Sequence, residues 1–167
     1  RAYLTEQKIG KIKAVIGGVA GSFDRRKSVI VGGGGNIKGW AGKPLKQILE
    51  RGLKAHVFLE NDAALAGLGE AMRGAGRGKR IVAYFTVSTG FGGARITGGK
   101  IDESAYGFEP MYQIIGGGKK FCGKCRDIYL GYHLSGKAIS EHYHKNPKDI
   151  ESRKIRDDLS RSLAIAL

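Results

Sequence analysis

The sequence has few cysteines, few acidic residues and no long hydrophobic run. No apolar stretch approaches the roughly 20 residues that cross a bilayer, which excludes a membrane-spanning helix. Two cysteines cannot form the disulfide framework of a small secreted protein, and the polar N-terminal residues do not form a secretory signal. These absences predict a soluble cytoplasmic protein with no membrane partner.

Acidic residues are outnumbered by basic ones, 15 to 29, and the formal net charge is +14. The basic residues are spread along the chain, and no aromatic residues alternate with them as a stacking platform for bases requires. No zinc-finger or RNA-binding sheet motif occurs either. The charge therefore favours a basic solvated surface that attracts anionic substrates over a specific nucleic-acid interface, although a basic nucleic-acid-binding module remains an alternative.

Glycine is abundant, with 28 of the 167 residues, but it is dispersed among apolar segments without a short period. This dispersion excludes collagen-like and linker sequences. Apolar runs predict buried strands, and apolar residues at helical spacing predict helices between them. The strands are expected at residues 12–19, 29–31, 55–59, 81–87 and 94–97, and the helices after Pro44, over 63–72, near 135–142 and from about 147. Strands alternating with helices predict an α/β fold.

Asp62 lies where the predicted strand 55–59 passes into the predicted helix 63–72. The first N–H groups of a helix lack helical partners, and the helix dipole favours negative charge at this end. A carboxylate there tends to stay ionised, can accept a proton, and lies at the carboxyl end of a strand, where open α/β sheets bind ligands. The alternative is an ordinary helix N-cap.

A second candidate site is the turn at residues 88–93, Ser-Thr-Gly-Phe-Gly-Gly, between the strands 81–87 and 94–97. Glycines allow the backbone to approach a phosphate closely, and successive turn N–H groups form an anion-binding concavity. The hydroxyls of Ser88 and Thr89 are additional donors. Glycine-rich turns also join many strands without binding a ligand.

Together, these segments resemble a known pattern. Asn61-Asp62 before an alanine-rich helix, the Ser-Thr-Gly-x-Gly-Gly turn at 88–93 and then Gly107-Phe108-Glu109 resemble the ROK (repressor, open reading frame, kinase) family of sugar kinases and regulators. The resemblance extends over residues 10–145, and the order and spacing of the blocks are more specific than any single block.

The resemblance implies the actin-like ATPase (ribonuclease H-like) fold of a two-lobed sugar kinase. Residues 1–79 would belong to the small sugar-binding lobe and residues 80–167 to the large nucleotide-binding lobe, with the boundary in the glycine- and lysine/arginine-rich segment 74–79. The Asp-Gly-Gly-Thr phosphate loop with which such kinases begin does not occur. The final apolar repeat also lacks a capping glycine, so we expect the chain to be truncated at both ends.

The implied reaction is ATP-dependent phosphorylation of a glucose-like hexose, with Asp62 as the general base and Mg²⁺ on the phosphates. Relatives are often homodimers. The residues that would hold the nucleotide phosphates are Ser88, Thr89, Gly90 and Gly92. Those that would bind the sugar are Gly21, Asn36, Asn61, Glu109 and Tyr112.

Some of these positions have other interpretations. Gly21 and Asn36 can be turn residues without a ligand, and Glu109 can be a surface glutamate. Met111-Tyr112 replaces the Gly-His of the family, and Gly131 stands where the family has a sugar-binding glutamate. These departures favour a rival hypothesis, a sugar-binding regulator or a catalytically degenerate ROK protein.

Cys122 and Cys125 have the Cys-x-x-Cys spacing of two zinc ligands, at the place of the cysteine-rich zinc loop of the family. A third and a fourth ligand are not evident at the family positions, and His133, His142 or His144 could serve only if the fold brings them near. A redox pair would need a strand-to-helix context that is lacking here. Zinc and idle structural thiols both remain open.

Overall fold

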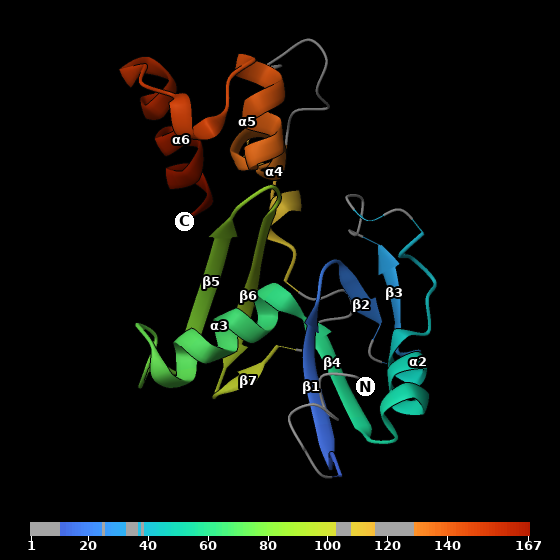
Figure 1. Cartoon of the computed structure of the whole chain (residues 1–167). Helices are drawn as coiled ribbons and strands as arrows, with labels where there is room; N and C mark the ends of the chain where they lie inside the picture. The colour runs from blue at the N-terminus through green and yellow to red at the C-terminus, as the bar shows by residue number, and fades with distance from the viewer. Residues whose placement is uncertain (1–10, 25, 33–36, 38, 103–107, 116–128) are drawn as a thin grey trace.

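The structure is a computed structural model that describes residues 11–24, 26–32, 37, 39–102, 108–115 and 129–167. It is mixed α/β, with three small sheets and helices beside them, as Figure 1 shows. None of the helices among the described residues combines the length and the apolar character that a membrane crossing requires.

The first sheet consists of β1 (Ala14–Val19) and β4 (His56–Asn61), which pair in parallel, so that both strands end at the same edge. Strands β2 (Ser22–Asp24) and β3 (Val29–Gly32) form an antiparallel pair directly after β1. Helix α2 (Leu45–Leu53) leads into β4 and contacts it, with Pro44 at its N-cap position and Lys54 in a left-handed conformation at its C-cap.

Helix α3 (Asp62–Arg73) follows β4 without a loop and packs on the hairpin of β5 (Ile81–Val87) and β6 (Phe91–Thr97). Strand β7 (Lys100–Ile101) extends that sheet. Small residues on α3 allow the close approach, because a Cβ at Gly67 would lie 2.9 Å from the Tyr84 Cβ and 3.0 Å from the Ala94 Cβ. The core here is formed by Ala64, Ala71, Ala94 and Ile96.

The C-terminal part is helical. It contains η1 (Pro110–Tyr112), α4 (Gly131–Leu134), α5 (Gly136–Tyr143), η2 (Pro147–Asp149) and α6 (Arg153–Ala166). Leu130 and Leu134 pack on Phe91 of β6, with Leu159 and Leu163 of α6 at the edge of this cluster, so the helices are anchored on the hairpin.

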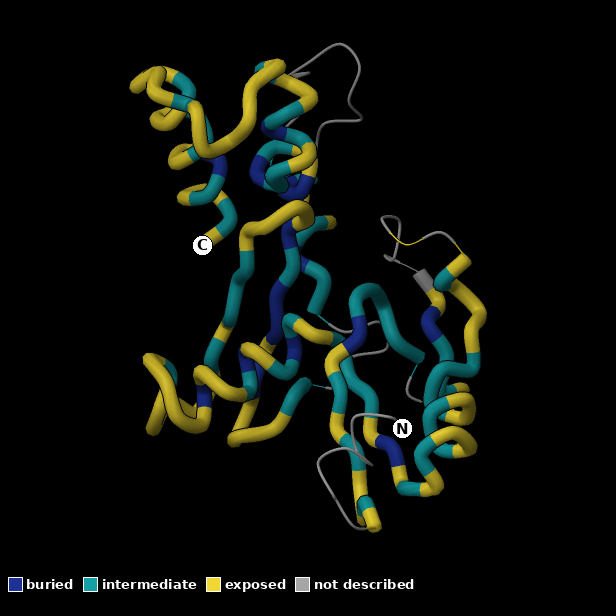
Figure 2. Tube along the Cα trace, in the orientation of Figure 1, coloured by how far each residue is buried: buried dark blue, intermediate teal, exposed yellow. Residues whose placement is uncertain are grey.

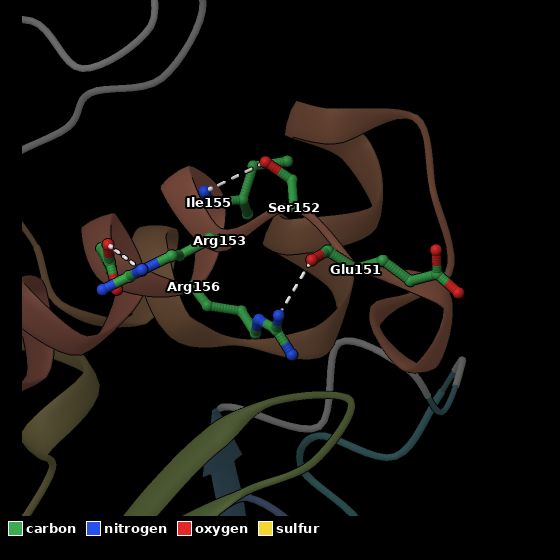
Figure 3. A network of polar contacts seen from close by, with 6 residues as sticks. Glu151, Ser152, Arg153, Ile155 and Arg156 are labelled. Carbon is green, nitrogen blue, oxygen red and sulfur yellow. Dashed lines mark hydrogen bonds and ion pairs between the residues drawn. The ribbon is translucent and has the colours of Figure 1, made fainter.

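Helix α6 begins at Arg153, and the helix expected from about residue 147 was wrong over its first six residues. Figure 3 shows the reason: the Ser152 hydroxyl accepts a hydrogen bond from Ile155 N at 3.5 Å, and Arg156 Nη2 donates to Glu151 O at 2.9 Å. Ser152 is therefore the N-cap of α6, and the preceding Pro147 belongs to the separate η2 turn.

Two further expectations about strands need correction. Strands 12–19 and 55–59 were expected to be buried, but Val57 is 1% exposed whereas Phe58 is 60% and Ile16 75% exposed. Ile16 and Phe58 are partners in the register, so the two exposed side chains lie on the same face of this sheet, and Figure 2 shows exposed segments along both strands. The second hairpin strand begins at Phe91 instead of residue 94, because Gly92 and Gly93 pair with Thr86 and Phe85.

Candidate functional site

Asp62 is the first residue of α3 and is exposed. The N-cap is Asn61, whose Oδ1 accepts a hydrogen bond from Ala64 N at 3.0 Å. Asp62 Oδ1 accepts from Ala63 N at 2.8 Å, and among the described residues Oδ2 has no hydrogen-bond partner. Because Asn61 caps the helix, the N-cap interpretation of Asp62 is wrong, and one carboxylate oxygen is left for other chemistry.

Two neighbouring strands lie close to the start of α3, at Gly18 and at Gly92. A Cβ at Gly18, near the end of β1, would lie 3.2 Å from the Asp62 Cα and 3.3 Å from its Cβ. A Cβ at Gly92, in β6, would lie 3.5 Å from the Ala63 Cβ. The end of β1 and the start of β6 therefore both meet the first turn of α3. The 88–90 turn ends two residues before Gly92 in the sequence.

The turn between β5 and β6 is exposed at Ser88, Thr89 and Gly90. Its carbonyl groups are directed to the start of α5: Gly136 N donates to Ser88 O at 2.8 Å, and Lys137 N donates to Thr89 O at 3.1 Å. Ser88 N donates to Gly90 O at 2.9 Å. The N–H groups of Thr89 and Gly90 have no hydrogen-bond partner among the described residues, so they are available to an anion.

The turn after β1 is held by three long-range hydrogen bonds to three consecutive residues. Trp40 Nε1 donates to Ala20 O at 3.1 Å, and Asn61 Nδ2 donates to Gly21 O at 3.0 Å. The Ser22 hydroxyl donates to Glu109 Oε1 at 2.9 Å. Gly21 has φ 101°, which favours glycine, so it is a turn residue whether or not it also contacts a ligand.

Asn61 is engaged through both ends of its amide, by the cap to Ala64 and the bond to Gly21. An amide has two N–H donors and an oxygen with two lone pairs, so one donor and one lone pair remain. Asn61 therefore supports the turn after β1 and still has the capacity to bind a sugar hydroxyl.

Glu109 is half-buried and precedes η1, and its carbonyl accepts from Tyr112 N at 3.1 Å. Tyr112 is 53% exposed, and its ring packs edge-to-face on Tyr129 with 6.0 Å between the centroids. A Cβ at Gly131 would lie 2.7 Å from the Met111 Cβ. Met111 and Gly131, which both depart from the family pattern, are thus in contact. Met111 occupies the space that a side chain at position 131 would need.

Asn36, Cys122 and Cys125 lie outside the described residues. Within the part of the chain that the structure describes, no three His, Cys, Asp or Glu side chains are grouped so as to hold a metal ion.

A separate hollow lies between α4, α5 and α6. None of the residues predicted to bind the sugar or the nucleotide lines it. Burial, and secondly the charge of Asp158, raise the pKa of Tyr143 above its ordinary value there. The lining residues are Tyr132, His133, His142, Tyr143, Asp158, Leu159 and Ser162.

No sequence motif signals the role of Ser22, because its partner Glu109 is 87 residues away. Lys137 and Gly136 were also missed as supports of the turn, since their contacts with it use backbone atoms only.

Comparison with known proteins identifies the relatives. The model of the ROK family matches residues 4–166. The glucokinase of Halalkalibacterium halodurans is 37% identical over 91 residues, which are 52% of this chain and 28% of that protein.

Two solved structures are similar over most of the chain. The ROK hexokinase of Thermus thermophilus matches with a TM-score of 0.71 and 28% identity, over 89% of this chain and 55% of that one. A ROK family glucokinase of Streptomyces griseus, solved in complex with glucose and AMPPNP, matches with a TM-score of 0.66 and 29% identity, over 84% of this chain and 45% of that one.

The chain thus spans about half the length of these solved relatives, and the match covers less than a third of the curated glucokinase. The predicted fold class is confirmed: the described elements form part of the actin-like ATPase fold of ROK sugar kinases. Because the family model matches nearly all of its residues, the chain belongs to the ROK family.

Proposed function

We propose that this chain is part of an ATP-dependent sugar kinase that phosphorylates a hydroxyl of a glucose-like hexose, with Asp62 as the general base. The similarity to glucokinases and to a ROK hexokinase supports the reaction class. The observation that carries the assignment is the exposed Asp62 carboxylate, which keeps one free oxygen among the described residues and lies on the helix turn that Gly18 and Gly92 approach.

In this reaction the sugar hydroxyl oxygen forms a bond to the γ-phosphorus of ATP while the bond to the ADP oxygen breaks. Asp62 accepts the hydroxyl proton. The transition state of phosphoryl transfer is loose, so positioning and charge neutralisation matter most. Asp62 would supply the base, and the 88–90 turn, which ends two residues before the contact of Gly92 with Ala63, would bind the phosphates.

The 88–90 turn fits the phosphates of the nucleotide. Two N–H groups are free among the described residues, the hydroxyls of Ser88 and Thr89 are exposed, and a Cβ at Gly90 would meet no atom within 4 Å. Gly92 lies across from Ala63, since a Cβ at Gly92 would be 3.5 Å from the Ala63 Cβ. Phosphate oxygens can approach the backbone here without steric hindrance.

Mg²⁺ would neutralise charge on the phosphates. It usually keeps several waters and binds through one or two carboxylates and the substrate phosphates, so it does not need a dedicated cage. We assign no role to zinc.

The sugar would lie next to the turn after β1. Gly21, Asn61, Glu109 and Tyr112 are the described candidates for its contacts, and Asn36 remains a sequence-based one. Residues 1–79 would form part of the sugar-binding lobe and residues 80–167 part of the nucleotide-binding lobe. A cytoplasmic location and a homodimer stay predictions.

The test is ADP release by the full-length protein in the presence of hexose, ATP and Mg²⁺, compared with each substrate alone. Asp62→Asn should reduce kcat by about 10²- to 10⁴-fold, the usual contribution of a general base, while hexose binding by calorimetry is retained. Asp157→Asn on the surface of α6 is the matched control and should keep wild-type kcat.

Wild-type turnover in Asp62→Asn would contradict the base assignment. A protein that binds hexose but releases no ADP would instead be a sugar-binding regulator or a degenerate kinase.

A further inference from the structure

The Ser22 side chain connects the turn after β1 to the Glu109 carboxylate. Its hydroxyl donates to Glu109 Oε1 at 2.9 Å, between two part-buried side chains. A hydroxyl that donates to a carboxylate makes a charge-assisted hydrogen bond, which is stronger and better oriented than one between neutral groups. The bond fixes the end of a glutamate side chain that otherwise has three rotatable torsions.

The Ser22 end of this contact is itself held in place. Ser22 begins β2 and is paired with Gly32 of β3. The two preceding carbonyls accept hydrogen bonds from Trp40 and Asn61, at 3.1 and 3.0 Å. The Ser22 hydroxyl is therefore presented from a turn that three other segments determine, and it does not depend on the segment that carries Glu109.

The Glu109 end is anchored through its backbone. Its carbonyl accepts from Tyr112 N at 3.1 Å, and the next residue, Pro110, is buried. Among the described residues, Ser22 is the hydrogen-bond partner of Oε1, and Oε2 has none. One oxygen is thus used for orientation, and the other is left to accept from a ligand.

We propose that Ser22 is a positioning residue for sugar binding: it orients the Glu109 carboxylate so that Oε2 accepts a hydrogen bond from a hexose hydroxyl. This inference rests on the proposed function and adds to it a side chain that does not itself need to touch the sugar. A pre-oriented acceptor loses less conformational freedom when the sugar binds, so Ser22 contributes to sugar affinity and not to the chemical step.

The test is steady-state kinetics of the full-length protein with hexose and ATP. Ser22→Ala should raise KM for the hexose about ten-fold, the effect of one lost hydrogen bond to a charged group, with kcat within about three-fold and KM for ATP unchanged. Ser22→Thr keeps the hydroxyl and should stay near wild type. Ser22→Cys keeps the volume but donates weakly, so it should behave like Ser22→Ala.

A double-mutant cycle isolates the contact. Glu109→Gln should also raise KM for the hexose, and Ser22→Ala should add little to it, because both substitutions remove the same oriented carboxylate. Ser160→Ala, at an exposed position of α6, is the matched control. The fluorescence of Trp40, the single tryptophan, reports whether the turn stays folded, since its Nε1 bonds Ala20 O.

Different results would contradict the role of Ser22 and the proposed kinase activity. An active wild type with an unchanged KM in Ser22→Ala, or with additive effects in the cycle, overturns the role of Ser22 and leaves the kinase assignment intact. A wild type that releases no ADP with any hexose overturns the kinase assignment, and calorimetry that shows no hexose binding either overturns the role of Ser22 as well.

Discussion

Replacing Gly136 by alanine should displace the 88–90 turn. A Cβ at this position would lie 2.7 Å from Ser88 O, and the atom that it meets belongs to the backbone, so the turn or the helix has to move. The movement weakens the two hydrogen bonds that fix the turn, Gly136 N to Ser88 O and Lys137 N to Thr89 O.

The cost follows from these contacts. Two backbone hydrogen bonds contribute about 1–3 kcal/mol together. The higher helix propensity of alanine returns at most about 1 kcal/mol, since position 136 is the first residue of α5. We therefore expect Gly136→Ala to lower the free energy of unfolding by about 1–2 kcal/mol and to weaken nucleotide binding about ten-fold.

The measurements are thermal unfolding and calorimetric titration with a non-hydrolysable ATP analogue, which do not depend on turnover. Gly69→Ala is the matched control: Gly69 is helical and exposed, and a Cβ there would meet no atom within 4 Å. That substitution should raise stability by about 0.4–1 kcal/mol and leave nucleotide affinity unchanged. Wild-type stability and nucleotide affinity in Gly136→Ala would refute the reasoning.

Two further predictions concern packing. Gly67→Ala should lower the free energy of unfolding by about 1–3 kcal/mol, because its Cβ would lie 2.9 Å from the Tyr84 Cβ between α3 and the hairpin. Denaturant unfolding measures this loss. A stabilised variant would contradict the close packing of α3 on the hairpin. Gly131→Glu should destabilise the protein by a similar amount, because its Cβ would lie 2.7 Å from the Met111 Cβ. Adding Met111→Gly should recover part of the lost thermal stability. Equal thermal stability of the single and the double variant would show that the two positions are not coupled.

Local chemistry made the centre of the site predictable from the sequence. The change from strand to helix at Asp62 follows from an apolar run that meets residues at helical spacing, and the helix begins at that residue. The glycine-rich turn between two strands is equally local. Only the alternative interpretation of Asp62, as the N-cap, was wrong locally, because Asn61 and Asp62 are both good N-cap residues and only the backbone conformation separates them.

Contacts between distant segments were not predictable. The Ser22–Glu109 bond joins residues 87 apart, and neither residue type signals the other. The exposed face of β1 and β4 was also missed, because an apolar run such as that around Ile16 does not say which of its two faces is covered. Periodicity determines which residues share a face, whereas burial depends on what packs against it.

Close contacts in the structure explain why some of the abundant glycines are needed, which composition alone does not show. Gly18 allows β1 to approach the start of α3, and Gly136 allows α5 to approach Ser88 O. At Gly52 and Gly69, by contrast, a Cβ would meet no atom within 4 Å. Replacement by alanine should therefore destabilise the protein at Gly18 and Gly136 and stabilise it at the exposed, helical Gly69. The effect of each substitution depends on what lies across from the glycine: Gly18 lies against Asp62 and Gly136 against the 88–90 turn, whereas Gly67 and Gly131 are restricted by packing contacts with Tyr84 and Met111.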